Sequence, residues 1–129
     1  METIQPKMSS HVLLARALAG DPMAVAIFFI DDNGEVVDSA MADGVEYEIS
    51  VIGAYLEIHL RKLRDVALEW NDAPSHFIHF EKGRFQFMAA VLPDGYFLVM
   101  VLGRPSLIAR SKRVLLEAVE SITKEFFAP

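Results

Sequence analysis

The stretch FIHFEKGRFQFMAAVLPDGYFLVMVL, residues 77–102, predicts three consecutive strands joined by two tight turns. Gly83 and the segment Pro93-Asp94-Gly95 form the turns, because glycine adopts positive φ and Pro-Asp initiates a turn. The last strand is apolar at every position, which predicts a strand covered on both faces, whereas the first strand is mixed, as at a sheet edge. The three strands are predicted over residues 77–81, 84–92 and 96–102.

A second central strand is predicted upstream, followed by a hairpin signal. Residues 24–30 are apolar throughout and rich in aromatic and β-branched side chains, so they too predict a strand buried on both faces. Asp31-Asp32-Asn33-Gly34 follows, and its Asn-Gly pair suits the left-handed conformations of a type I′ turn. The return strand is predicted over residues 35–41. Ahead of this hairpin, Ser9 or Ser10 caps a short predicted helix over residues 12–19.

The longest predicted element is a helix over residues 45–70, which begins with the capping pattern formed by Asp43 and Glu46. Its helical spacing produces two apolar stripes on different sides. One sheet cannot cover both stripes, so we expect the shorter stripe to meet a partner. The longer, core-facing stripe contains Val45, Ile49, Ile52, Leu56, Leu60, Leu63, Ala67 and Trp70, and the shorter stripe contains Tyr47, Val51, Ala54 and Ile58.

The predicted fold class is α+β, with the element order α-ββ-α-βββ-α and a last helix over residues 106–127. The two fully apolar strands occupy the centre and the half-polar strands the edges, which predicts a five-stranded antiparallel sheet in the order 2-1-5-4-3. The long middle helix is expected on one face of this sheet and the terminal helices on the other. We expect a single domain over residues 1–129, in which residues 1–8 form a loose segment.

Composition narrows the class of function. The 129 residues are 53% hydrophobic, which suffices for one core. The formal net charge is −6 and no dense Lys/Arg stripe is present, so nucleic-acid binding is not predicted. Apolar runs are far shorter than the roughly 20 residues of a membrane helix, and the chain has no cysteine. These features predict a cytoplasmic protein without a membrane span.

No set of side chains in the sequence predicts a metal site. Residues 31–35 lack the spacing of a calcium loop, and the hairpin turn explains their acidic and amide side chains better. His76 and His79 are three residues apart, which on a strand places them on opposite faces, so they cannot chelate one ion together. His59 lies at the margin of the core stripe and is interpreted as a partly buried histidine.

Catalytic and cofactor-binding motifs are equally absent from the sequence. No serine or threonine has the setting of an activated nucleophile, and the glycines form no phosphate-binding loop. Arg104 and Arg110 could contact a phosphate or an acidic surface of a partner, but a solvated surface role is the favoured interpretation. We therefore expect a protein that is not an enzyme and that binds no cofactor.

The order and spacing of three stretches resemble the roadblock/dynein-light-chain domain family. The first stretch is Phe28-Phe29-Ile30-Asp31-Asp32-Asn33-Gly34-Glu35-Val36-Val37. The second is residues 85–102 with the Pro93-Asp94-Gly95 turn, and the third is Ala109-Arg110 followed by residues 115–119. The similarity spans most of residues 10–127. The chain departs from the family at Asp21-Pro22-Met23, where the family often has small residues.

This resemblance implies a non-enzymatic homodimer, or a heterodimer with a paralogous chain, that binds and regulates a small Ras-like GTPase or serves as a scaffold or light chain. In such dimers the third strands pair edge to edge and the second helices lie side by side. The alternative is a small-ligand sensor, since profilin-like and PAS-like domains share this architecture. The expected dimer interface contains Tyr47, Val51, Ala54, Tyr55, Ile58, Phe77, Ile78, His79 and Phe80, and the expected partner-binding residues are Glu46, Glu57, Arg61 and Arg64.

Overall fold

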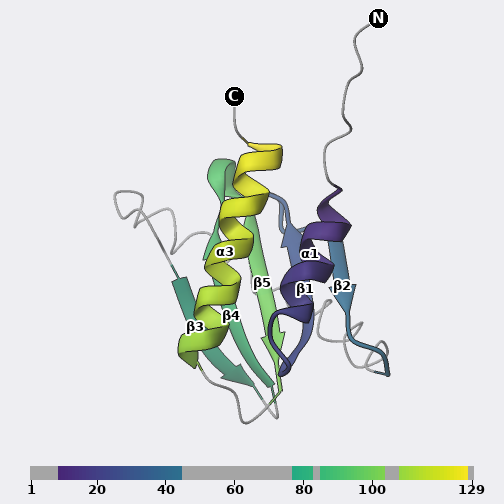
Figure 1. Ribbon diagram of the computed structural model, residues 1–129. Coiled ribbons are helices and arrows are strands. Elements are labelled where there is room, and N and C mark those ends of the chain that lie inside the picture. The colour runs from purple at the N-terminus through teal and green to yellow at the C-terminus, as the bar shows by residue number, and fades with distance from the viewer. Residues whose placement is uncertain (1–8, 45–76, 83–84, 104–107, 128–129) are drawn as a thin grey trace, which may run out of the picture.

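The computed structural model describes residues 9–44, 77–82, 85–103 and 108–127 (Figure 1). Five strands in these ranges form one antiparallel sheet, in the order β2-β1-β5-β4-β3. Two helices, α1 and α3, lie together on one face of the sheet (Figure 1). The elements are α1 Ser10–Ala19, β1 Ala24–Ile30, β2 Val36–Met41, β3 Phe77–Lys82, β4 Phe85–Val91, a 3₁₀ turn Pro93–Gly95, β5 Phe97–Leu102 and α3 Ile108–Phe126.

The two central strands, β1 and β5, have apolar side chains on both faces of the sheet. Along β5, Leu98 and Met100 belong to the core cluster that includes α1 and α3, and the alternate residues Val99 and Val101 belong to a cluster on the opposite face. All six residues of β5 are buried. The position of β5 between β1 and β4 follows from this composition, because only a central strand buries a continuous apolar run.

The helical face of the sheet is closed by packing between α1, α3 and the strands. Leu14 of α1 and Leu115 and Ile122 of α3 are fully buried in the cluster that also contains Ile27. The side chain of Ser9 accepts a hydrogen bond from the backbone N–H of Val12 and so caps α1. At the C-terminal end of α3, the ring centroids of Tyr96 and Phe127 lie 5.1 Å apart in an edge-on arrangement. This contact anchors the end of the helix.

The first hairpin does not contain the predicted type I′ turn. Gly34 has a φ of 85°, but Asn33 is not among the described residues with positive φ. The backbone N–H of Gly34 donates to the carbonyl of Asp31 at 3.0 Å, and the pairing of β1 with β2 shifts by one residue after Phe29. The connection is therefore a three-residue loop in which a bulge glycine follows an ordinary turn.

Type I′ geometry occurs instead in the second hairpin, at Asp94-Gly95. Asp94 has a φ of 62° and Gly95 a φ of 81°, and the N–H of Tyr96 donates to the carbonyl of Pro93. Aspartate tolerates the left-handed region better than most residues because its short polar side chain bonds locally. Pro93 therefore precedes the two central turn residues and is not one of them.

The predicted fold class needs a correction in its helices. The described residues contain two α-helices and one 3₁₀ turn, whereas the sequence predicts three helices. The predicted helix over residues 45–70, with its position on the second face of the sheet, lies outside the described residues. Apolar periodicity shows that a segment can form an amphipathic helix, but helical stability comes mainly from tertiary packing, which the periodicity does not specify.

Candidate functional site

The outer edge of β3 is the first candidate site. β3 is the last strand of the described sheet and pairs with β4 from Phe77 opposite Ala90 to Lys82 opposite Phe85. Within the described residues no strand lies on its other side. This position matches the edge role predicted from its mixed composition, and edge strands are where a further strand can pair with a sheet.

The register shows which residues of β3 face outward. The N–H of Leu92 donates to the carbonyl of Tyr96 at 2.8 Å, in register with the pairing of Val91 and Phe97. Hydrogen-bonded pairs alternate along an antiparallel ladder, so the even-numbered residues of β4 bond to β5 and the odd-numbered residues bond to β3. Phe87 and Ala89 therefore bond Phe80 and Ile78. The backbone groups of Phe77, His79 and Glu81 face outward.

The side chain of His79 is exposed on this edge, as is that of Glu81. Of the residues predicted at a dimer interface, four lie on β3: Phe77, Ile78, His79 and Phe80. The predicted interface residues Tyr47, Val51, Ala54, Tyr55 and Ile58 and the predicted partner-binding residues Glu46, Glu57, Arg61 and Arg64 lie outside the described residues, as do His59, His76 and Arg104.

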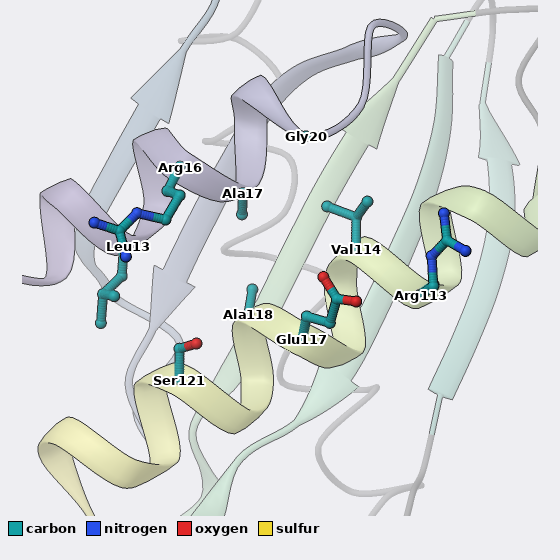
Figure 2. A pocket seen from close by; sticks show the side chains of 9 residues that line it. All are labelled: Leu13, Arg16, Ala17, Gly20, Arg113, Val114, Glu117, Ala118 and Ser121. Atoms are coloured by element: carbon teal, nitrogen blue, oxygen red, sulfur yellow. The ribbon is translucent and has the colours of Figure 1, made fainter.

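A groove of about 420 Å³ between α1 and α3 is the second candidate site (Figure 2). Its apolar floor comes from Leu13 and Ala17 of α1 and from Val114 and Ala118 of α3. The charged side chains at its margins are exposed. This groove lies between two helices, whereas the alternative function of a ligand sensor calls for a cavity between a helix and the sheet. The remaining lining residues are Arg16, Gly20, Arg113, Glu117 and Ser121.

A buried polar cluster joins the start of α3 to the loop before β1. The side chain of Asp21 is fully buried, and its Oδ1 accepts hydrogen bonds from the backbone N–H of Met23 at 2.9 Å and from Arg110 Nη2 at 3.2 Å. Ser111 Oγ donates to the other carboxylate oxygen. These hydrogen bonds fix the backbone at Met23 and the side chains of Arg110 and Ser111. The cluster therefore has a structural role, because the carboxylate is enclosed and its described partners already occupy it.

The interpretation of Arg110 as a solvated surface cation is therefore wrong. Its side chain is 29% exposed, and its guanidinium forms an ion pair with a carboxylate 89 residues earlier in the sequence. Sequence reasoning also missed Asp21 itself, which it treated only as a departure from the family pattern. The one local signal was an aspartate between a helix-ending glycine and Pro22 in an otherwise apolar setting.

The acidic turn after β1 binds its own backbone. Asp31 Oδ1 accepts hydrogen bonds from the N–H groups of Asn33 and Glu35, both at 2.9 Å. This is the turn role predicted in preference to calcium binding. Across residues 9–44, 77–82, 85–103 and 108–127, no group of three or more His, Asp or Glu side chains is placed to hold a metal ion. No helix in those ranges has the length and apolar content to cross a membrane.

Known proteins resemble the chain in structure. No protein-family model and no curated protein matches the sequence. Among solved structures, MglC from Myxococcus xanthus aligns with a TM-score of 0.70 and 16% identity, over 92% of this chain and 100% of that one. A roadblock/LC7 domain from Streptomyces avermitilis aligns with a TM-score of 0.70 and 13% identity, over 92% of this chain and 98% of that one.

A third similar structure is MglB in a tetrameric arrangement, with a TM-score of 0.68 and 14% identity, over 89% of this chain and 85% of that one. Similarity at these TM-scores establishes a common fold, and identities of 13–16% establish nothing beyond it. The chain therefore has a roadblock/LC7 fold, as the resemblance noted from its sequence implies.

Proposed function

We propose that this chain is a non-enzymatic interaction module that forms a dimer through the outer edge of β3 and binds a small Ras-like GTPase across that dimer. The observation that carries the proposal is the position of β3 as the last strand of the described sheet. A row of outward N–H and C=O groups is a template for another strand, and β3 has neither a proline nor a bulge that would prevent pairing.

The geometry of the edge favours an isologous pair. The backbone groups of Phe77, His79 and Glu81 face away from β4, so an antiparallel copy centred on His79 would meet these positions in register. A two-fold axis through such a pair makes one closed dimer and joins two sheets of five strands into one continuous sheet. The structural similarity to MglB in a tetrameric arrangement supports self-association of this fold.

The predicted second interface element lies on residues 45–70. Two copies would bring the apolar stripe of Tyr47, Val51, Ala54 and Ile58, together with Tyr55, against its counterpart. The charged residues Glu46, Glu57, Arg61 and Arg64 would then surround an apolar centre, which is the usual composition of a recognition surface. The resemblance to roadblock domains supplies the class of partner, and a cytoplasmic location follows from that partner.

Binding to a GTPase tests this function directly. The purified protein is titrated into a Ras-like GTPase from the same genome, loaded in parallel with GDP or with a non-hydrolysable GTP analogue. We expect the two affinities to differ by at least about tenfold, equal to ~1.4 kcal/mol. Arg61→Glu and Arg64→Glu should weaken the tighter complex, because each reverses a charge on the proposed surface. Lys112→Glu, on an exposed position of α3, is the matched charge-reversal control.

Two results would contradict the proposal. One is equal affinity for the two nucleotide states, or no binding to any such GTPase. The other is turnover of a small substrate by the purified protein alone that is lost when a single histidine or aspartate is replaced, because this would indicate an enzyme.

A further inference from the structure

The opposite end of the sheet, at β2, differs from β3 in its hydrogen bonding. The N–H of Ala42 donates to the carbonyl of Val25 at 2.8 Å, in register with the pairs Ala26 with Met41 and Ile27 with Ala40. Alternation along the ladder then places the backbone groups of Ala40 toward β1 and those of Ser39 outward. Ser39 therefore occupies on β2 the place that His79 occupies on β3.

Both outward backbone groups of Ser39 already have partners. Its N–H donates to Asp38 Oδ1 at 2.8 Å, and its carbonyl oxygen lies 3.0 Å from His11 Nδ1. A carbonyl oxygen can only accept, so His11 Nδ1 carries the hydrogen in this contact. A strand that approached β2 at this position would find neither its central donor nor its central acceptor available. We call the side chains of His11 and Asp38 the edge cap.

The first turn of α1 holds the edge cap in place. Ser10 Oγ donates a hydrogen bond to Asp38 Oδ2, and His11 Nδ1 lies 3.7 Å from Asp38 Oδ1. α1 packs directly against β1 and β2, which fixes this turn over the edge (Figure 1). The side chain of Asp38 is only 27% exposed although it belongs to an edge strand. The contacts of Ser10 with Asp38 and of His11 with Ser39 thus each join α1 to β2 across 28 residues of sequence.

The side chains that flank Ser39 would favour association if the edge were open. Val37 is 52% exposed and Met41 is 38% exposed, and both lie two residues from Ser39 on β2. Exposed apolar side chains on an unprotected edge strand are the usual setting for pairing between chains. The bulge between β1 and β2 adjoins this segment and also disturbs the edge.

We propose that the edge cap closes β2 to strand addition, so that of the two edges of the described sheet β3 is the one that associates with a second copy. The proposal deepens the proposed function, on which the role of β3 rests. A chain with two open edges can add copies without limit, whereas a chain with one open edge stops at a closed pair. The edge cap therefore determines the size of the assembly.

The test opens β2 while β3 is blocked. His79→Pro removes an outward N–H of β3 without touching the ladder to β4, and it serves as the parent protein. We expect His11→Ala with Asp38→Ala, introduced into this parent, to double the mass measured by light scattering at micromolar concentration. Adding Ser39→Pro should restore the mass of the parent, because proline removes the outward N–H that the new contact needs.

The variant that also carries Ser39→Pro distinguishes edge pairing from unfolding, because aggregation of an unfolded chain would not be reversed by Ser39→Pro. Ser10→Ala is the matched control, because it removes the hydrogen bond to Asp38 but leaves both contacts to Ser39, and it should keep the mass of the parent. If circular dichroism shows that the double variant is unfolded, His11→Ala alone, which retains Asp38, replaces it with the same expectation. A folded variant that keeps the mass of the parent overturns the proposal.

This experiment distinguishes failure of the proposed function from failure of the edge cap. If the His79→Pro parent is itself a dimer, the assignment of β3 as the dimer edge is wrong. The change caused by opening β2 is still measured against that parent, and doubling of its mass would support the edge cap alone.

Discussion

Ser111 donates its hydroxyl hydrogen bond to the buried carboxylate of Asp21, a residue 90 positions earlier in the sequence. Arg110 approaches the same carboxylate at 3.2 Å, and the N–H of Met23 donates to it at 2.9 Å. One side chain thus holds together the first turn of α3 and the segment that connects α1 to β1. Since β1 is central in the sheet, this contact sets the position of α3 relative to the core.

Asp21→Ala should destabilise the protein by about 3 kcal/mol, because it leaves Arg110 and Ser111 without their buried partner. Urea unfolding monitored by circular dichroism measures the change. Arg113→Ala is the matched control, since this arginine is exposed and lies one helical turn from Arg110, and it should change stability by less than ~0.5 kcal/mol. Equal effects of the two substitutions would show that the cluster does not stabilise the fold.

Elements determined by neighbouring residues in the sequence could be predicted, whereas contacts between residues far apart in the sequence could not. The apolar run at residues 24–30 gave the bounds of β1 because a strand buried on both faces has no polar alternation. The partnership of Asp21 with Arg110 has no such local pattern, because each residue alone is an ordinary surface charge. The edge cap was missed for the same reason, since His11 and Asp38 meet only after α1 packs on β2.

A type I′ turn was predicted, but it was assigned to the first hairpin and occurs in the second. Asn33-Gly34 is the stronger dipeptide signal for type I′, yet the side chain of Asp31 bonds the N–H groups of Asn33 and Glu35 and stabilises a longer loop. The position of β3 at a sheet edge was predicted from its mixed composition, whereas a dimer interface on it was implied by the family resemblance. The part of that interface on residues 45–58 rests on periodicity alone, because the structure does not describe it.

Gly95→Ala should lower the free energy of unfolding by about 1–2 kcal/mol, because φ is 81° at this position and a Cβ there is strained. The added Cβ would also lie 3.4 Å from the Cβ of Asp32. Asp94→Asn should be neutral within ~0.5 kcal/mol, since asparagine tolerates the left-handed region as well as aspartate does. Thermal unfolding of both variants tests this pair, and a neutral Gly95→Ala would contradict the assigned turn geometry.

Leu115→Ala should destabilise the protein by about 2–5 kcal/mol, because the side chain is fully buried between α3 and the sheet and its loss leaves a cavity. Glu120→Ala, at an exposed position of the same helix, should have an effect below ~0.5 kcal/mol. Guanidinium unfolding compares the two variants. A loss of less than 1 kcal/mol for Leu115→Ala would mean that α3 is not docked as described.

Val51→Lys and Ile58→Glu should each weaken the proposed dimer by at least about 2 kcal/mol, because each places a charge in an apolar contact. Arg61→Glu lies on the same predicted helix and should leave the dimer intact. Sedimentation velocity over a range of concentrations measures the dissociation constants. An intact dimer in Val51→Lys, together with altered dimerisation and normal folding in Leu56→Lys, would reverse the assignment of the two stripes.

The mass of the protein in solution tests dimerisation through β3 most directly. Light scattering on the wild-type chain at micromolar concentration should give twice the 14.4 kDa of a single chain, and His79→Pro should give the mass of a single chain with an unchanged circular dichroism spectrum. Phe80→Pro, which removes a hydrogen bond to β4, should unfold the sheet edge and so confirms the register. A wild-type protein of single-chain mass with normal solubility, or a His79→Pro variant that stays dimeric, would contradict dimerisation through β3.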